Sequence, residues 1–261
     1  MTNTNTHSTT TTIDAAAIDP ISKREAPGLA EEEYRRWAVA VAELKPADWD
    51  RPTDCELWTV RDMAGHVLGA MQAAASIREQ LSQQREIGKR HKATGENEVQ
   101  IMTALQIERT ADLSAVELIA KTRSLVSLAA KGRKRIPGPM RRLVKIPVDL
   151  GSIVETWTLG YLVDTILTRD IFMHRIDLAR AIGGSPDLTG QHAVRIVQDI
   201  VGEWARRHDR PFDLTLVGPA GGRFRVAGGD AERIEIEALE FCRILSGRGT
   251  SDGLLTQQVP F

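Results

Sequence analysis

Two carboxylates and one imidazole share one side of a predicted helix in the segment RDIFMHRIDLARA, residues 169–181. At about 100° per residue, Asp170, His174 and Asp177 fall within roughly 60° of one another. The neighbouring stripe of the helix is apolar and consists of Leu167, Ile171, Leu178 and Ala181. The polar side chains therefore lean toward the core. A buried carboxylate is costly unless a hydrogen bond, a counter-ion or a metal compensates it, so we expect a partner.

A metal ion is one such partner. Asp170 and His174 are four residues apart, a spacing at which two helical side chains can bind the same ion. His66 is the candidate third ligand, because it lies at the margin of the buried face of another predicted helix. Two histidines, one carboxylate and open positions for water are typical of a catalytic site for zinc or another divalent ion. Asp177, one turn beyond His174, could accept a hydrogen bond from a ligand and orient it.

The alternative is a helix that carries ordinary ion pairs. In that interpretation both histidines are imidazoles at the edge of the core, and the acids pair with nearby arginines: Asp170 with Arg169 or Arg175, and Asp177 with Arg180. The two interpretations differ in one distance. One shared ion requires the nearest ring nitrogens of His66 and His174 to lie roughly 3–3.5 Å apart, about an ångström more without metal. A gap above about 7 Å would exclude the metal.

Composition limits the possible partners of the chain. It has 261 residues, of which 42% are hydrophobic, and a formal net charge of -1. That charge predicts no nucleic-acid or anionic membrane partner. The two cysteines, Cys55 and Cys242, lack metal-site spacing and are expected to be small apolar core residues in a reducing compartment. Neither a membrane span nor a secretory signal is apparent, so we expect a cytoplasmic protein.

Helical periodicity dominates the chain up to about residue 189. The Thr-rich residues 1–27 are predicted to be a disordered tail, since they contain few large apolar side chains. Four main helices are predicted by three- and four-residue apolar spacing, at residues 29–44, from Thr59, at 114–131 and at 152–182. A further helix is predicted at 75–89, which could extend the helix from Thr59, or at 99–109. Residues 28–189 are therefore predicted to form an up-and-down four-helix bundle, which could bring His66 alongside Asp170 and His174.

A basic segment interrupts this pattern. Residues 131–145 carry seven basic side chains, and prolines make a regular helix impossible there. The segment could receive an anionic group near the mouth of the bundle, or it could be a solvated loop.

Residues 190–261 follow a different pattern. One helix is predicted at 191–207, strands with period two at 212–218, 222–228 and 233–238, and a closing helix at 237–248. This is a small α+β domain, so the fold class of the whole chain is α+β.

Two motifs together resemble the mycothiol-dependent maleylpyruvate isomerase family, which belongs to a wider group of thiol-using, DinB-like four-helix proteins. They are WDRPTDCELWTVRDMAGHVLGAM, residues 49–71, and RDIFMHRIDLARAIG, residues 169–183. The resemblance implies a divalent metal, usually zinc, bound by His66, Asp170 and His174, and a domain like sterol carrier protein from residue 190 to 261. Family enzymes typically have glutamate where this chain has Asp170, which leaves the identity of the metal open.

The resemblance also implies an activity. It is that of a metal- and mycothiol-dependent isomerase or thiol transferase, with a small electrophile and a low-molecular-weight thiol as partners. A metal lowers the pKa of a bound thiol, and the thiolate attacks carbon electrophiles. In the isomerase reaction the thiol adds to a conjugated double bond, the resulting single bond rotates, and elimination gives the trans isomer. Neither cysteine of the chain needs to take part, and the oligomeric state stays open.

A second hypothesis is a non-catalytic protein that binds a small ligand or lipid in the α+β domain, with the bundle as scaffold. The alternating strands and the resemblance to sterol carrier protein motivate it. A unit of about 70 residues, however, needs most of its apolar side chains for its own core, which argues against a large apolar cavity.

Overall fold

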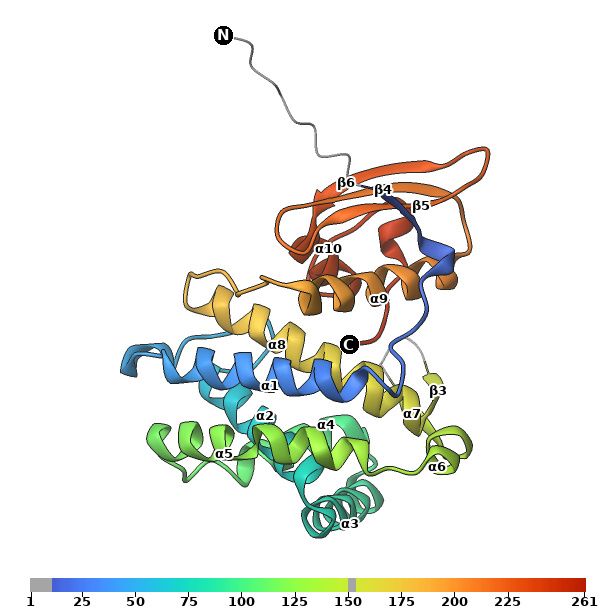
Figure 1. Ribbon diagram of the computed structural model, residues 1–261. Helices are drawn as coiled ribbons and strands as arrows, with labels where there is room; N and C mark the ends of the chain where they lie inside the picture. Colours follow the sequence, from blue (N-terminus) through green and yellow to red (C-terminus); the bar gives the residue numbers. More distant parts are fainter. Residues whose placement is uncertain (1–10, 150–153) are drawn as a thin grey trace. The chain divides into compact units, whose positions relative to one another are not determined.

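The computed structural model describes residues 11–149 and 154–261, which divide into two compact units (Figure 1). A helical unit comprises residues 21–187 and Phe261. A smaller unit combines the N-terminal residues through Pro20 with residues 188–260. Helices in the N-terminal part and a sheet in the C-terminal part confirm the predicted α+β class. Among the described residues, every helix is too short or too polar to cross a lipid bilayer.

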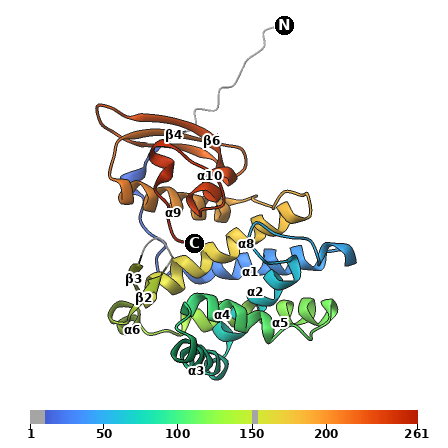
Figure 2. The same ribbon diagram turned by 180° about the vertical axis from the view of Figure 1, so that it is seen from behind.

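Four long helices of the helical unit pack around a common core (Figure 2). They are α1 (Ala26–Ala42), α2 (Val60–Ala75), α5 (Ala115–Lys134) and α8 (Leu167–Ala181). Buried apolar side chains from these helices fill the space between them, among them Trp37, Met63, Leu118 and Ile171. Two further helices, α3 (Ile77–Thr94) and α4 (Glu98–Glu108), pack against α2. Both segments considered for the third helix are therefore helical.

Local hydrogen bonds set the start of α2, the helix that carries His66. The hydroxyl of Thr59 accepts from the backbone N–H of Asp62, and the Asp62 carboxylate accepts from the backbone N–H of Thr59 at 2.9 Å. This reciprocal pair satisfies two N–H groups at the helix end. The helix start predicted at Thr59 is confirmed.

The helix predicted over residues 152–182 begins later than the sequence suggested. Val154–Thr158 form strand β3, which pairs antiparallel with β2 (Lys145–Asp149). The alternating β-branched residues Val154, Thr156 and Thr158 favour a strand, and tertiary pairing with β2 stabilises it. The helical path then starts with α7 (Leu159–Tyr161), capped by the Thr158 hydroxyl. It continues through a π-helical turn (Leu162–Ile166) into α8.

The described residues of the small unit form a four-stranded sheet and two α-helices, besides short 3₁₀ turns (Figure 1). Its strands lie in the order β1 (Thr12–Asp14), β5 (Gly222–Val226), β4 (Phe212–Val217) and β6 (Glu232–Glu237). β4 and β5 form an antiparallel hairpin, whereas β1 runs parallel to β5 and β6 parallel to β4. The helices are α9 (Gln191–His208) and α10 (Ala238–Leu245).

The described part of the predicted N-terminal tail is structured. Residues 1–10 lie outside the described residues, but β1 extends the sheet at its edge and Ile13 is paired with Phe224. A short 3₁₀ turn (Ala15–Ala17) follows, and Ala15 is fully buried. The prediction failed here because the partner strand lies about 200 residues away, and local composition carries no sign of such a pairing.

The two faces of the sheet have different chemistry. Large side chains of the small unit are fully or almost fully buried, among them Trp204, Phe212, Phe224 and Phe241. On the other face, one register row crosses all four strands with alternating charge: Asp14, Arg225, Asp213 and Arg233. Opposite charges side by side stabilise such pairs in water. This face is polar and does not resemble the wall of a lipid cavity.

Candidate metal centre

Three predicted ligands come together between helices α2 and α8. His66 Nε2 lies 3.9 Å from Asp170 Oδ2, and His174 Nε2 lies 3.2 Å from Asp170 Oδ1. The two imidazole rings are 5.2 Å apart between centroids and nearly perpendicular. One ligand atom from each of the three residues lies within 4.8 Å of the other two. The separation that would have excluded a shared ion, about 7 Å, is not reached.

Asp177 lies behind His174, on the other edge of the ring. Its Oδ2 is 3.4 Å from His174 Nδ1, and its side chain is fully buried. A carboxylate at this position favours the tautomer with the proton on Nδ1, which leaves Nε2 free to bind a cation. The fourth predicted residue therefore lies where it can orient a ligand.

The ring of His66 carries an orphaned nitrogen. His66 is buried, and its Nδ1 has no hydrogen-bond partner among the described residues. A cation on Nε2 would leave this Nδ1 unpaired, so the case for a cation rests on the other ring nitrogen, which faces Asp170. Two imidazoles and one carboxylate are also a usual ligand set for zinc, so the residues suit a divalent ion.

The charges of the site are strongly coupled. Burial alone would raise the pKa of the Asp170 carboxyl, but the charge of His174, its 3.2 Å contact and the nearby His66 imidazole outweigh it. The pKa of Asp170 is thus held well below its usual range. Burial alone would lower the pKa of His174. The charge of Asp170 and hydrogen bonds to the neighbouring acids outweigh this and raise the pKa of His174 well above its ordinary value. A divalent cation would take the place of the His174 proton as the partner of Asp170.

Two residues of the loop before α2 complete the surroundings, and their roles were not foreseen in the sequence. The Cys55 thiol lies 3.5 Å from Asp177 Oδ2 and 3.9 Å from His174 Nδ1. The Trp58 ring lies 5.1 Å from the His66 ring and 5.9 Å from the His174 ring. Trp58 is thus a wall of the site as well as a packing residue. The only available signal was the position of both residues within the motif that ends at Met71.

The basic segment is neither a solvated loop nor an open anion site throughout. Arg133 and Arg141 are buried, and both bind the helical turn that precedes α8. Arg133 Nε donates to the Val163 carbonyl at 2.9 Å, and Arg141 donates to both Asp164 carboxylate oxygens. A π-helical turn shifts carbonyls out of the α-helical pattern, and these guanidinium groups satisfy what it exposes. The two arginines therefore hold in place the helical turn that leads into α8, the helix that carries Asp170.

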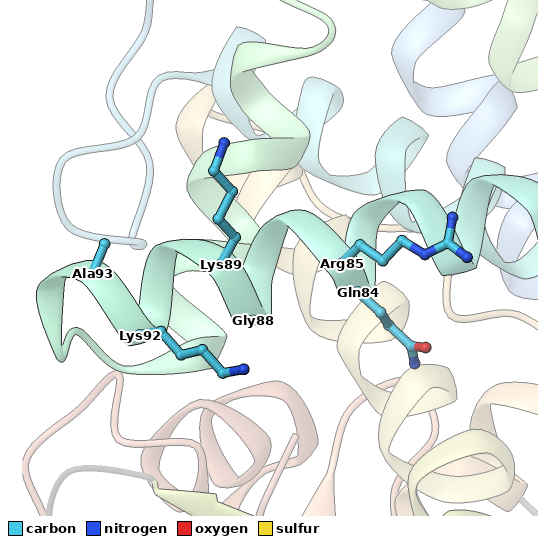
Figure 3. A pocket seen from close by; sticks show the side chains of 6 residues that line it. All are labelled: Gln84, Arg85, Gly88, Lys89, Lys92 and Ala93. Carbon is cyan, nitrogen blue, oxygen red and sulfur yellow. The ribbon is translucent and has the colours of Figure 1, made fainter.

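A hollow of about 610 Å³ lies elsewhere, on the outer side of α3 (Figure 3). All of its lining residues belong to this one helix: Gln84, Arg85, Gly88, Lys89, Lys92 and Ala93. Figure 3 shows their long side chains pointing in different directions, without a common centre. A single convex helix cannot enclose a ligand, so this surface is not a second candidate centre.

Comparison with known proteins agrees with the motifs. The family described as "Mycothiol maleylpyruvate isomerase N-terminal domain" matches residues 30–179, a range that contains all four predicted site residues. The crystal structure of the mycothiol-dependent maleylpyruvate isomerase is similar, with a TM-score of 0.54 and 17% sequence identity. The alignment covers 92% of this chain and 95% of that chain. A crystal structure of a histidine-to-alanine mutant of that enzyme has the same TM-score and coverage at 16% identity. No curated protein sequence matches significantly.

Proposed function

The chain belongs to the mycothiol maleylpyruvate isomerase N-terminal domain family, and on that basis we propose that it is a metal- and mycothiol-dependent enzyme. It isomerises a small electrophile or transfers a thiol to it. His66, Asp170 and His174 are the metal ligands, and zinc is the expected ion. One observation carries the proposal: ligand atoms contributed by two separate helices lie within 4.8 Å of one another. In the same proposal, residues 28–189 are the metal-binding bundle, DinB-like in fold, and residues 190–261 a domain resembling sterol carrier protein.

The residues around the ligands have distinct roles in this proposal. A bound divalent ion lowers the pKa of a coordinated thiol, so that thiolate is available near neutral pH. Asp177 holds the Nδ1 proton of His174 and keeps Nε2 directed toward Asp170. Trp58 covers both imidazoles and limits the access of water to them. Arg141 binds Asp164 and steadies the turn that leads to Asp170.

Metal content tests the ligand set. Protein purified without chelator should contain about one divalent ion per chain by elemental analysis. The variants His66→Ala and His174→Ala should each lose it. His91→Ala is the matched control, because His91 is exposed on α3, where its Nδ1 lies 2.7 Å from the backbone oxygen of Glu96. Stoichiometric metal in His174→Ala would refute the proposed ligands.

Two activity assays separate the possible reactions. Isomerisation of maleylpyruvate can be followed by ultraviolet absorbance with and without mycothiol. Thiol transfer can be followed with an activated aryl halide as the electrophile. Activity in either assay should require both mycothiol and an intact His174. Metal-loaded protein that is inactive in both assays, with a range of small electrophiles, would contradict the enzymatic role while leaving the metal site intact.

A further inference from the structure

A second group of potential ligands surrounds the other edge of the His174 ring. Cys55 Sγ, His174 Nδ1 and Asp177 Oδ2 form a triangle with sides of 3.9 Å, 3.4 Å and 3.5 Å. One ligand atom from each residue lies within 4.8 Å of the others. This triangle shares only His174 with the group formed by His66 and Asp170.

The size of this triangle suits a tetrahedral ion. Bonds of about 2.3 Å to sulfur and about 2.0–2.2 Å to nitrogen and oxygen place the donor atoms roughly 3.3–3.6 Å apart. The sides of the triangle agree with this range to within a few tenths of an ångström. The donors are a thiol, an imidazole and a carboxylate, all of which are established zinc ligands.

The loop that carries Cys55 is held by its own hydrogen bonds. The Thr53 hydroxyl accepts from the Cys55 backbone N–H at 3.2 Å and donates to the Trp58 carbonyl at 3.0 Å. The Trp58 backbone N–H donates to the Cys55 carbonyl at 3.1 Å, and Pro52 and Thr59 form a β-bridge at the base of the loop. The thiol is therefore positioned against His174 by a closed loop, as a preorganised ligand requires.

We propose that Cys55, His174 and Asp177 form an alternative metal position that selects thiophilic divalent cations. It is separate from the position at His66 and Asp170, and it does not depend on the enzymatic activity proposed above. The two positions exclude each other. Simultaneous occupancy would strip both ring protons from His174 and place two divalent cations on one buried imidazole, where they repel each other.

Metal softness decides between the positions. Thiolate ligands favour soft ions such as Cd²⁺, whereas imidazole and carboxylate suit harder ones. A soft ion bound through Cys55 takes His174 by its Nδ1 edge and removes Asp177 as the acceptor that orients the ring. With a thiophilic ion bound in this way, His174 is no longer available as the third ligand beside His66 and Asp170.

Cadmium titration of the metal-free full chain tests this proposal. A thiolate bound to Cd²⁺ gives a ligand-to-metal charge-transfer band in the ultraviolet. We expect this band to saturate at one ion per chain. Cys55→Ala should abolish the band and raise the Cd²⁺ dissociation constant by at least tenfold, the lower end of the loss caused by removing even an outer partner. His66→Ala should keep the band and change the dissociation constant by less than about tenfold, the smallest loss expected on removing even an outer partner.

Two controls keep the result interpretable. Cys242→Ala removes the other cysteine, which is buried in α10 of the small unit, and should keep the band. Cys55→Ser retains the size of the side chain and serves as a second variant should Cys55→Ala fold poorly by circular dichroism. A band that survives both Cys55 substitutions, or that disappears in His66→Ala, would overturn the proposal. So would saturating Cd²⁺ binding without any band. Failure of the enzymatic proposal appears in the zinc content and activity assays instead.

Discussion

The carboxylate of Asp177 lies 3.4 Å from the Nδ1 nitrogen of His174, one helical turn away and fully buried. The first prediction follows from this pair. Asp177→Asn should weaken zinc binding by about 10–100-fold, because an amide no longer favours the Nδ1 proton of His174. Isothermal titration calorimetry measures the change. Asp54→Asn is the matched control, since Asp54 forms a partly exposed ion pair with Arg180 and should leave the affinity unchanged. Equal affinities in both variants would contradict the orienting role.

The coupled charges of Asp170 and His174 predict a pH dependence. The pKa of His174 is raised above its ordinary 6.5, so its contribution to stability is full below that pH and is lost as pH rises through the folded-state pKa. The pKa of Asp170 is lowered from 3.8, so its contribution is full above that value and is lost in stronger acid. The pair should therefore contribute most to the unfolding free energy of the metal-free protein between roughly pH 4 and 6.5.

Metal binding requires a neutral His174 and therefore has the opposite dependence. The difference in unfolding free energy between zinc-loaded and metal-free protein should grow as pH rises from 6 to 8. Urea unfolding at several pH values, with zinc or with chelator, measures it. In metal-free Asp170→Asn the loss of stability as pH rises should be much weaker, because the main cause of the raised pKa of His174 is gone. A difference that stays constant with pH in the unsubstituted protein would contradict the coupling.

Close packing between α5 and α2 gives a third prediction. A Cβ atom at Gly132 would lie 1.7 Å from the backbone oxygen of Ala74, so Gly132→Ala must push the helices apart. We expect a loss of at least about 1–3 kcal/mol of unfolding free energy, as for other overpacked cores. Gly88→Ala is the control, because nothing lies within 4 Å of its Cβ position on α3. It should gain up to about 1 kcal/mol from helix propensity. Urea denaturation distinguishes the two, and equal effects would refute the packing argument.

A fourth prediction concerns the buried ion pair between Arg141 and Asp164. Arg141→Ala leaves the Asp164 carboxylate buried without its guanidinium partner and should cost about 3–5 kcal/mol. The neighbouring Arg142 is exposed, so Arg142→Ala should change stability by less than about 0.5 kcal/mol. Thermal or urea unfolding provides the comparison. Were the two variants equally stable, Arg141 would not be holding the turn before α8.

The N-terminal strand gives a fifth prediction. Deletion of residues 1–17 removes β1 and the 3₁₀ turn, and it exposes the edge of β5. Amide hydrogen exchange in Gly222–Val226 should become faster, because their backbone groups lose their partners on that side. Deletion of residues 1–10 alone retains β1 and is the control. Unchanged exchange in the longer deletion would mean that β1 does not protect the edge.

Sequence reasoning worked best where the decisive interactions are local. The capping pair at Thr59 and Asp62 and the four-residue spacing of Asp170 and His174 can be read directly, because helix geometry fixes both. It worked less well where pairing or packing with another segment decides the outcome. The residues of β3 lie in a stretch that also has helical apolar spacing, and antiparallel pairing with β2 decides their state. Composition suggested solvent exposure for Arg133 and Arg141. Both are buried, because they bind a carbonyl and a carboxylate of the π-helical turn.

Cys55 shows the same limit at the site itself. It is separated from His174 by 119 positions in the chain, and nothing in its spacing indicates that its thiol faces that ring. An isolated cysteine is most often a small apolar residue. The loop that closes on Thr53 changes this, because it carries the thiol to the edge of the imidazole.

The small unit is built from both ends of the chain, which constrains the order of events during synthesis. Thr12 leaves the ribosome early, but its partner Arg223 is made only after the whole helical unit. At about 5–20 residues per second, β1 must wait roughly 10–40 s for its sheet. The helical unit needs only residues 21–187 for most of its contacts and can fold in that interval. Translation pauses before Gly222 should therefore delay the small unit alone, and a nascent chain stalled there should already bind zinc.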